Sequence, residues 1–306
     1  MIKVGSLFAG IGGFDLGFTR AGFEVAWSVE INTDCQKVLR KQFPNAKIYG
    51  DIAQVKVEDL ERVDVVCGGF PCQDLSFAGN RKGLAGERSG LFYEAIRLIR
   101  GINPRIVILE NVPGLLASNQ GRDFAILLSE MDKGWDCQEI AWRVLDSQFF
   151  GVAQRRKRVF IVASSRIGSA EQILALNESV SGDLEQSQEQ RKNIAHTIDA
   201  NRHESDSEPI AIRTAFTGAN GIGVSVGVSH TLDLANGQAV TDNDKIRRFT
   251  PVEVERLQGF PDNWTAGQTD ADRYKQSGNA VTVNVIEWLA NNTKKCMVHQ
   301  MMNLRK

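Results

Sequence analysis

The sequence has few of the features that mark special classes of protein. Its five cysteines are odd in number and include no CxxC pair, which excludes a disulfide framework and gives no recognisable zinc site. Cys67 and Cys72 also lack other ligand-type residues at metal-binding spacing. We therefore expect no bound metal.

An excess of charge of either sign is also lacking. The chain of 306 residues carries 36 Lys and Arg against 37 Asp and Glu, a net charge of -1. This balance argues against binding of polyanions over the whole surface, so any contact with nucleic acid must come from local basic clusters. The length allows one large α/β domain, or a large and a small one.

Long apolar runs are absent. No stretch approaches the length of a membrane span. Residues 2–8 already have the pattern of a strand, which leaves no room for the parts of a signal peptide. We therefore expect a cytoplasmic protein that makes no membrane contact.

An apolar, β-branched segment at residues 63–67 is followed by two glycines and a cysteine in a proline turn. Such a segment is typical of a strand buried on both faces of a parallel sheet. Because open α/β sheets bind ligands beyond the carboxyl ends of their strands, Cys72 is a candidate functional thiol. A buried, inert cysteine is the alternative, but Pro71 before it and polar Gln73 and Ser76 after it favour an exposed loop.

Strand 2–8 leads into a glycine turn and then a helical segment that ends near Gly22. Glycines let the backbone approach a ligand closely, as in nucleotide-binding folds. The dinucleotide fingerprint GxGxxG fits only in part, because Gly10 and Gly12 match whereas Asp15 stands where the third glycine belongs. By itself the turn also fits a tight strand-to-helix corner or a nicotinamide oxidoreductase.

Two acidic residues stand at the ends of the next two predicted strands. Glu30 closes the strand at residues 23–29, roughly twenty residues after the glycine turn, where it can accept hydrogen bonds from ribose hydroxyls. Asp51 ends a third predicted strand and is placed to bind an adenine amino group. Each acid alone is more typical of a helix cap. Together with the glycine turn, they predict an adenosine cofactor.

Two loops lie near the cysteine in the predicted order. Residues 77–90 are rich in Gly, Arg and Lys, as in a loop that closes over a polyanion or one that is simply solvated. A strand at residues 104–109 then precedes Glu110, which we place in a second catalytic-looking loop. Partial desolvation there would raise its pKa enough for it to donate a proton near neutral pH.

A run of four cations at residues 155–158 lies between strands predicted at residues 135–144 and 159–163. Alternation along a strand predicts that Arg156 and Arg158 share one face.

The chain changes character between residues 164 and 244, where residues 179–193 are polar and typical of a linker. The similar segments 194–199 and 228–233 predict two equivalent short strands of a second, smaller domain.

Two helices are predicted near the carboxyl end. The first has Thr250 as N-cap, Pro251 at its first position, Glu253 completing a capping box and Gly259 after its end. The second is predicted to begin at residues 277–282 and to run to about residue 289, which places Asn279 near its start.

Taken together, these segments resemble the cytosine-C5 DNA methyltransferase family of the bacterial and bacteriophage type. The matching stretches follow the order of that family: FAGIGGF, Glu30, GDI, GFPCQ, ENV, QRRKR, RRFTPVEVERLQGFPD and GNAVTVNV. They cover residues 1 to about 163 and 246–290.

The resemblance implies a Rossmann-like α/β sheet with helices on both faces that binds S-adenosylmethionine and releases S-adenosylhomocysteine. It also implies a smaller target-recognition domain, mostly β or irregular. We place the catalytic domain at residues 1–163, completed by residues 272–306, and the recognition domain at residues 164–271.

The resemblance also assigns site residues. Cys72 would attack C6 of cytosine, Glu110 would protonate or hydrogen-bond N3 and the exocyclic amine, and Arg158 would hold O2. Cofactor contacts are assigned to Phe8, Gly10, Ile11, Gly12, Gly13, Glu30, Ile31, Asp51, Ile52, Pro71, Leu91, Asn279 and Val281. DNA contacts are assigned to Gln73, Ser76, Arg81, Lys82, Arg88 and Arg156, of which Arg156 is expected mainly to support the active-site loops.

The function implied is transfer of a methyl group to C5 of a flipped-out cytosine in a specific sequence of double-stranded DNA. We expect a monomer in the cytoplasm of a bacterium or a phage-infected host, where a cognate restriction endonuclease would act separately. A transfer-RNA methyltransferase of the same fold and a DNA-binding relative that has lost catalysis are the alternatives. Intact Cys72, Glu110 and Arg158 argue against the second.

Overall fold

The computed structural model describes residues 1–71, 90–166, 168–176, 210–213, 224–226, 229, 238–242 and 245–303. The chain divides into two compact units. The first unit comprises Met1–Leu145, Lys157–Ala175 and Ile286–Lys306, and the second comprises Asp146–Arg156 and Leu176–Val285. The domain limits predicted from the sequence separate a catalytic domain from a recognition domain. The two compact units are defined by packing and do not test that functional division, so the limits stay a prediction.

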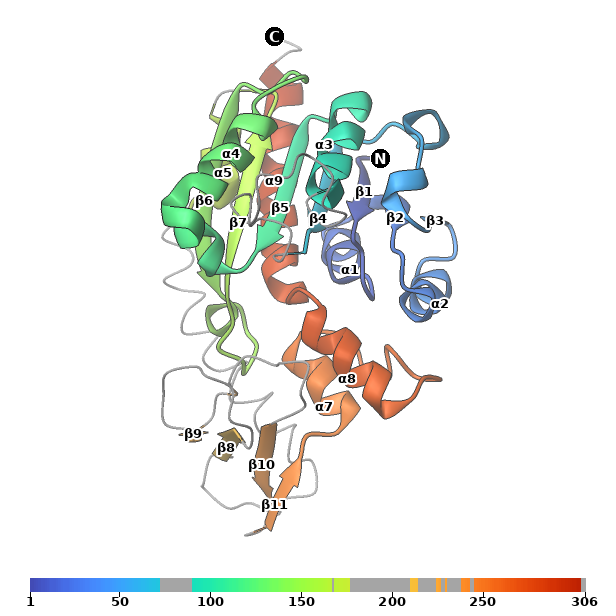
Figure 1. Ribbon diagram of the computed structural model, residues 1–306, viewed down its shortest axis with the longest axis vertical. Coiled ribbons are helices and arrows are strands. Elements are labelled where there is room, and N and C mark those ends of the chain that lie inside the picture. The colour runs from blue at the N-terminus through green and yellow to red at the C-terminus, as the bar shows by residue number, and fades with distance from the viewer. Residues whose placement is uncertain are drawn as a thin grey trace. The chain divides into compact units, whose positions relative to one another are not determined.

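A seven-stranded sheet with the order β3-β2-β1-β4-β5-β7-β6 forms the centre of the first unit (Figure 1). Its strands are β1 (Lys3–Leu7), β2 (Glu24–Val29), β3 (Lys47–Tyr49), β4 (Val65–Gly69), β5 (Ile106–Asn111), β6 (Glu139–Asp146) and β7 (Lys157–Ser164). Neighbours among β1 to β5 pair in parallel, whereas β7 runs antiparallel to β5. The strand order reverses between β1 and β4, which is the point where open α/β sheets bind their ligands.

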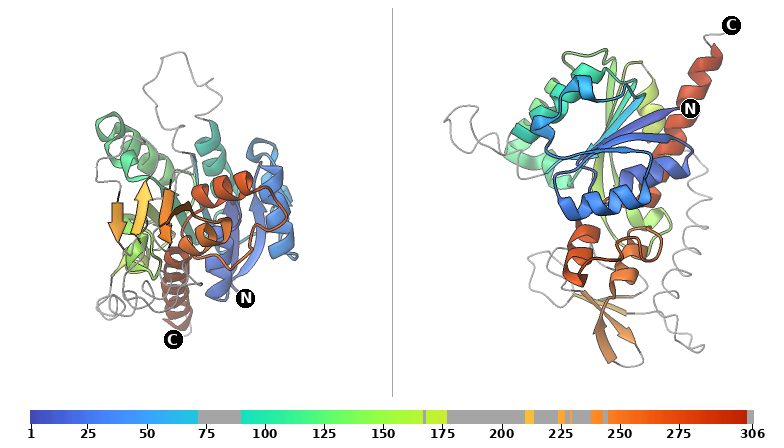
Figure 2. Two further views of the ribbon diagram at one scale, coloured as in Figure 1. Left: turned by 90° about the horizontal axis from the view of Figure 1, so that it is seen from below. Right: turned by 90° about the vertical axis from the view of Figure 1, so that its right-hand side faces the viewer.

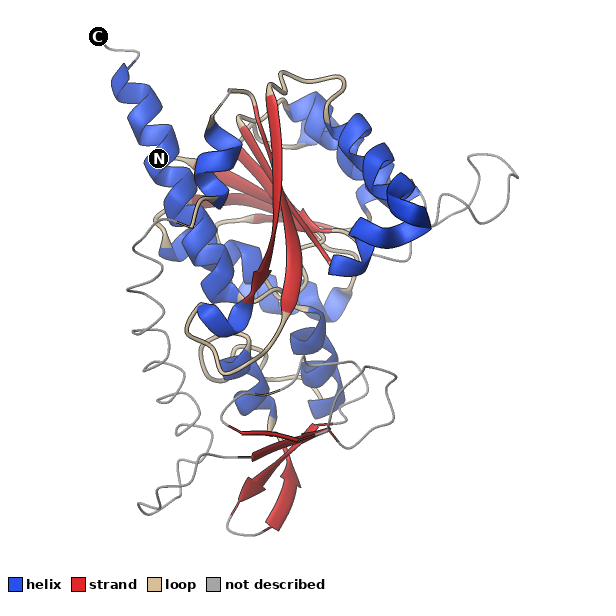
Figure 3. Cartoon of the chain, turned by 90° about the vertical axis from the view of Figure 1, so that its left-hand side faces the viewer, coloured by secondary structure: helices blue, strands red, loops and turns tan. Residues whose placement is uncertain are grey.

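Helices cover both faces of this sheet (Figure 3). They are α1 (Gly13–Arg20), α2 (Thr33–Gln42), α3 (Gly90–Ile102), α4 (Arg122–Met131), α5 (Ser169–Leu174) and α9 (Val283–Asn303), with short 3-10 helices η1 (Ile52–Gln54), η2 (Val57–Asp59) and η4 (Pro113–Gly121). Buried side chains of α3 and α4 join one core cluster with the strands. On the other face, the Asn292 side chain of α9 donates to the Ile173 carbonyl of α5. The sheet covered on both faces confirms the fold class predicted from the sequence.

The middle strands carry continuous apolar runs because both of their faces are covered. Val65, Val66 and Cys67 of β4 have no exposed surface, and Val107 and Ile108 of β5 are equally buried. A continuous apolar run is the pattern expected for such strands. The segment before the cysteine turn is therefore a central strand, as its composition predicted.

The second unit contains helices α7 (Pro251–Leu257) and α8 (Asp270–Asn279), the 3-10 helix η5 (Ser147–Phe149) and a small antiparallel sheet. The order of its strands is β11-β10-β8-β9 (Figure 2). Their bounds are β8 (Ile210–Arg213), β9 (Val224–Val226), β10 (Gln238–Asp242) and β11 (Lys245–Arg248).

The start of α7 follows the capping box predicted from the sequence. The Thr250 hydroxyl accepts from the Glu253 backbone N–H at 3.3 Å, and the Glu253 carboxylate accepts from the Thr250 N–H at 2.6 Å. Pro251 is the first helical residue. These reciprocal bonds satisfy backbone donors that the first turn of a helix leaves unpaired.

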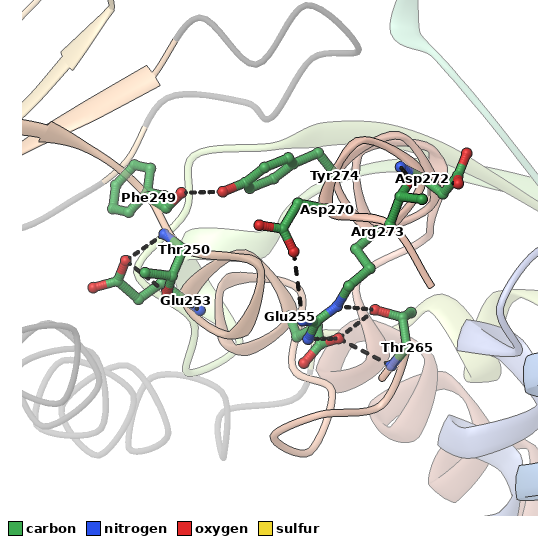
Figure 4. A network of polar contacts seen from close by, with 10 residues as sticks. Phe249, Thr250, Glu253, Glu255, Thr265, Asp270, Asp272, Arg273 and Tyr274 are labelled. Carbon is green, nitrogen blue, oxygen red and sulfur yellow. Dashed lines mark hydrogen bonds and ion pairs between the residues drawn. The ribbon is translucent and has the colours of Figure 1, made fainter. Parts of the chain in front are cut away.

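A buried carboxylate joins α7 to α8 (Figure 4). Glu255 has no exposed surface, and its Oε1 accepts from the Thr265 hydroxyl and from Nη2 of Arg273 at 3.0 Å. Arg273 also donates through Nε to the Thr265 hydroxyl at 3.0 Å. Nearby, the Tyr274 hydroxyl donates to the Phe249 carbonyl at 2.6 Å.

The helix predicted to begin at residues 277–282 and to run to about residue 289 is present as α9, but its bounds were wrong, because α9 runs from Val283 to Asn303. Asn279 is not near its start and is instead the last residue of α8. Helix α8 begins at Asp270 and has Thr269 as its N-cap, because the Thr269 hydroxyl accepts from the Asp272 N–H at 3.2 Å. The chain breaks after Asn279, since Ala280 has ψ 149 and leaves the helical conformation.

Other predicted bounds shift by a few residues. Strand β5 extends through Glu110 and Asn111, which were expected in a loop, because both pair with β7 and Glu110 also pairs with Gly69 of β4. Strand β6 begins at Glu139 rather than at residue 135. Of the two similar segments, 194–199 lies outside the described residues, and only Ser229 of 228–233 is described, in an isolated bridge. Residues 179–193 also lie outside them.

Candidate active site

Glu110 and Arg158 meet at the edge of the sheet where β4 and β5 end. Arg158 Nε lies 2.9 Å from Glu110 Oε1, and their side chains are only 17% and 13% exposed. Antiparallel pairing produces this contact, since Asn111 at the end of β5 pairs with Val159 near the start of β7. Two residues distant in the sequence therefore form a sheltered ion pair, in which each charge interacts more strongly than it would in water.

The last residue of β4 leaves space for the Glu110 carboxylate. Gly69 pairs with Glu110, and a Cβ at Gly69 would lie 2.8 Å from Glu110 Oε2. Any side chain there would displace the carboxylate. Asn111 adds a second link, because its Nδ2 donates to the Phe70 carbonyl at 3.0 Å while its Oδ1 accepts from the Val112 N–H at 2.8 Å. The chain entering Pro71 is thus fixed to β5.

The predicted catalytic cysteine follows directly on this segment. Cys72 lies outside the described residues, which resume at Gly90. The same holds for five of the six predicted DNA contacts: Gln73, Ser76, Arg81, Lys82 and Arg88. Pro71, the last described residue before them, is exposed.

Arg156 does not share a strand face with Arg158. Strand β7 begins at Lys157, and Arg156 belongs to the second unit. Arg156 is 4% exposed, and its Nη2 donates to the Ala280 carbonyl at 3.0 Å. Its burial argues against the predicted contact with DNA and favours the supporting role that was also expected.

The loop after β1 has the strained backbone of a ligand cradle. Phe8 has φ 54 and Gly10 has φ 56, both in the left-handed region that L side chains rarely adopt. The Gly10 N–H donates to Glu30 Oε2 at 2.7 Å, and the Asn32 N–H donates to Glu30 Oε1 at 2.7 Å. Glu30 therefore holds the loop and the start of α2 together.

This loop leaves room for a ligand. No atom lies within 4 Å of the position that a Cβ of Gly10 would occupy. Each Glu30 oxygen accepts one backbone hydrogen bond, and a carboxylate oxygen has a second lone pair that can accept from a hydroxyl. Ile31 beside it is 69% exposed, while Ile11 within the loop is buried. An open backbone cradle beside a hydroxyl acceptor fits an adenosine-type cofactor.

The remaining predicted cofactor residues of the first unit differ in burial and in hydrogen bonding. Asp51 caps η1, because its Oδ1 accepts from the Ala53 N–H at 3.0 Å, and its Oδ2 accepts from the Gln54 side-chain amide at 3.4 Å. Ile52 is 4% exposed and belongs to the core. Leu91, in the first turn of α3, is partly buried against that core. Gly12 and Gly13 are both buried.

Asn279, the last residue of α8, and Val281, between α8 and α9, lie in the second unit. Sequence reasoning overlooked the side chain that holds this part of the chain, Gln258, which has no exposed surface. Its Nε2 donates to the Ser277 carbonyl at 2.8 Å, and its Oε1 accepts from the Thr282 hydroxyl at 3.0 Å. No local pattern identifies this role, because the partners are distant in the sequence.

The described part of the chain contains no cluster of three or more His, Cys, Asp or Glu residues that could hold a metal ion. None of its helices is long and apolar enough to cross a membrane.

Comparison with known proteins identifies relatives along nearly the whole chain. A Type II methyltransferase of Bacillus sp. (strain RFL6), M.Bsp6I, is 31% identical over 320 residues, which cover 97% of this chain and 100% of the relative. The Type II methyltransferase M.HhaI of Haemophilus parahaemolyticus is 28% identical over 94% of this chain and 92% of its own.

Solved structures show the same fold. The Dnmt2 methyltransferase of S. pombe superposes with a TM-score of 0.68 at 18% identity, over 97% of this chain and 99% of that one. A putative DNA modification methyltransferase encoded in a prophage of E. coli gives a TM-score of 0.67 at 19% identity, over 97% and 100%. The model of the C-5 cytosine-specific DNA methylase family matches residues 2–210 and 169–295, and the chain belongs to that family.

Proposed function

We propose that this protein transfers a methyl group from S-adenosylmethionine to C5 of a cytosine in double-stranded DNA. The observation that carries the proposal is the sheltered pair of Glu110 and Arg158 beside the end of β4, from which the chain continues to Cys72. Membership of the C-5 cytosine-specific DNA methylase family supports it.

Cytosine C5 is a poor nucleophile, which explains the residues needed. The Cys72 thiolate attacks C6, so that C5 becomes enamine-like and able to take a methyl group. Glu110 interacts with N3 and the exocyclic amine, which favours the attack by stabilising the charge that develops on the ring. Arg158 donates to O2. Water or another base then removes the C5 proton, and the electrons of that C–H bond form the C5–C6 double bond and expel the Cys72 thiolate.

S-adenosylmethionine, when bound, supplies the methyl group. Within the first unit, the loop at Phe8, Gly10 and Ile11 would take it against its backbone, and Glu30 would accept from its ribose hydroxyls. The resemblance assigns it Asp51, Ile52, Pro71 and Leu91 as well, and Asn279 and Val281 from the second unit.

The target base must leave the helix stack before this chemistry can occur, because C6 is inaccessible in a duplex. Residues 73–90 would close over the flipped nucleotide and contact phosphates, which positions the DNA without reading its sequence. The smaller unit would then read the target sequence. We expect a monomeric, cytoplasmic protein that acts in restriction-modification or in protection of phage DNA, beside a separate endonuclease.

The test is expression of the full chain in a host that lacks cytosine methylation, followed by a map of 5-methylcytosine across the genome. The proposal predicts methylated cytosines confined to one short sequence. The same map from a Cys72→Ser strain should be empty, since a hydroxyl is a far weaker nucleophile than a thiolate.

Cofactor binding separates the two ways in which the test could fail. Cys72→Ser should bind S-adenosylhomocysteine as tightly as the parent protein does, because its thiol is assigned to the base and not to the cofactor. An unmethylated genome with the parent protein expressed and folded would contradict the proposal. Methylation retained by Cys72→Ser would contradict the nucleophile assignment alone.

A further inference from the structure

Asp15 is a buried carboxylate that no step of the proposed reaction uses. It lies in the first turn of α1 and has no exposed surface. Its Oδ1 accepts from the Ser28 hydroxyl at 2.7 Å, and its Oδ2 accepts from the Ser6 hydroxyl at 3.1 Å. Both carboxylate oxygens are therefore engaged, one with each of two neighbouring strands.

The two serines stand directly below the cofactor loop. Ser6 of β1 and Ser28 of β2 are paired across the sheet. Ser6 comes two residues before Phe8, where the loop begins, and Ser28 comes two residues before Glu30, which accepts from the loop at Gly10. Asp15 thus joins the start of α1 to both strands that bound the loop.

This arrangement replaces the third glycine of the dinucleotide fingerprint. In that fingerprint the third glycine lets the helix approach the strand closely. Here α1 carries Asp15 at the corresponding position and is fixed to the strands by hydrogen bonds instead. The N-cap residue of α1 is Gly12, which has no side chain to cap the helix. The hydrogen bonds of Asp15 instead link the start of α1 to the strands.

A buried carboxylate is a costly way to join three elements. Burial raises the pKa of Asp15 to about 6, which means that the surroundings disfavour its charge. An apolar side chain would avoid this cost, and stability is commonly given up at sites that serve function. The cost itself therefore indicates a role beyond packing.

We propose that Asp15 is a positioning residue for the cofactor, holding α1 against β1 and β2 so that the loop at residues 8–13 has its binding shape before the cofactor arrives. This proposal rests on the proposed function. Asp15 does not touch the cofactor and acts through the loop alone.

The test is the affinity of Asp15→Asn for S-adenosylhomocysteine, measured by calorimetry on the full chain. Asparagine has the same size but only one accepting oxygen, so one serine loses its acceptor. Loss of a buried hydrogen bond to a charged group predicts binding weakened roughly tenfold or more. The KM for S-adenosylmethionine should rise by a similar factor, with kcat at saturating cofactor near that of the parent protein.

Asp123→Asn is the matched control. Asp123 is also fully buried in the first turn of a helix, α4, after a left-handed glycine, and it accepts from the Ser118 hydroxyl at 2.6 Å. Its helix, α4, packs in the core cluster shared with α3, to which α1 contributes no residue. The control should be destabilised while binding S-adenosylhomocysteine as the parent protein does.

The outcomes separate this proposal from the proposed function. A parent protein that does not bind S-adenosylhomocysteine contradicts the proposed function, and the positioning role with it. A parent protein that binds, together with an Asp15→Asn variant of equal affinity, overturns the positioning role alone. An equal loss of affinity for S-adenosylhomocysteine in Asp15→Asn and Asp123→Asn also overturns the positioning role alone. If Asp15→Asn does not fold, Ser28→Ala keeps the carboxylate and removes one link, and unchanged affinity there overturns the role.

Discussion

At the scale of single residues, the Glu110–Arg158 pair is the feature on which the proposed chemistry depends. Its 2.9 Å contact orients both groups before any substrate is present, and the low exposure of the two side chains keeps water from screening them. Gly69 and Asn111 support the pair, one by leaving space and the other by linking β5 to the Phe70 carbonyl. A base entering this site meets groups that need little reorganisation.

Glu110→Gln tests the pair directly. Glutamine keeps the shape of the side chain but can neither donate a carboxyl proton nor carry a charge, so methyl transfer should slow by roughly 100- to 10,000-fold. Single-turnover transfer of a labelled methyl group measures the rate. Glu130→Gln is the control, since Glu130 pairs with Arg100 at 3.0 Å away from the sheet edge and should transfer at the parent rate. A near-normal rate for Glu110→Gln would contradict the role of Glu110.

Asp15 predicts a pH dependence of stability. Its pKa is raised from 3.8 to about 6 by burial, so between these values the folded chain binds more protons than the unfolded chain. The free energy of unfolding should therefore fall as pH rises from about 3, below the unfolded pKa, to about 7, above the folded pKa, and level off beyond, a total loss of about 3 kcal/mol. The nearby thiol Cys67 does not titrate in this range, because burial and Asp15 raise its pKa.

The measurement compares urea unfolding of the parent protein and of Asp15→Asn at several pH values, so that other titrating groups cancel. Asparagine does not ionise. The free energy of unfolding of Asp15→Asn should therefore rise relative to that of the parent protein as pH rises from 4 to 7. A difference that stays constant with pH would show that Asp15 does not titrate in this range.

At the scale of elements, side-chain caps and one buried charge define the helices of the second unit. The capping box at Thr250 was predictable because its two partners are three residues apart. The junction between α8 and α9 was not, since Gln258 holds it through long-range hydrogen bonds. Helix ends fixed locally can be read from sequence, whereas those fixed by tertiary contacts cannot.

Arg273→Met tests the link between α7 and α8. It removes the cation that pairs with Glu255, which has no exposed surface, and an uncompensated buried charge costs about 3–5 kcal/mol. Urea unfolding followed through the fluorescence of Trp264, buried in the same unit, measures the change. Arg256→Met removes the exposed pair with Asp262 and should cost less than about 1 kcal/mol. Equal effects of the two substitutions would contradict the importance of Glu255 burial.

At the scale of the whole molecule, the chain consists of two units with different construction. The first is a sheet whose strand order reverses between β1 and β4, and the loop at Phe8 and the segment at Pro71 leave the sheet from those two neighbouring strands. The second contains the small antiparallel sheet and the polar network around Glu255. In the proposed function the thiol chemistry and most of the cofactor contacts belong to the first unit, and sequence readout belongs to the second.

Substrate choice is a property of the whole chain. We expect labelled methyl transfer to duplex DNA and none above background to transfer RNA, because the long segment before the RRFTPVEVERLQGFPD stretch favours a DNA target. Both substrates should be assayed side by side at equal nucleotide concentration and at the same salt, since contacts to phosphate make affinity salt-dependent. Preferential transfer to transfer RNA would contradict the DNA assignment while leaving the cytosine chemistry intact.

The sequence by itself determined the features that depend on neighbouring residues. The apolar run of β4, the glycine turn after β1, the capping box at Thr250 and the ordered motifs were all present in the linear pattern. Each follows from local rules of strand burial, backbone freedom or helix capping, which act over a few residues.

Only the tertiary structure decided which distant side chains meet. Glu110 lies beside Arg158 because β7 runs antiparallel to β5, and Asp15 reaches Ser6 and Ser28 because α1 packs over the pair β1 and β2. Strand order and direction arise from packing of the whole sheet, so no local pattern encodes them. The same physical reason explains why candidate site residues could be predicted from the sequence whereas their contacts could not.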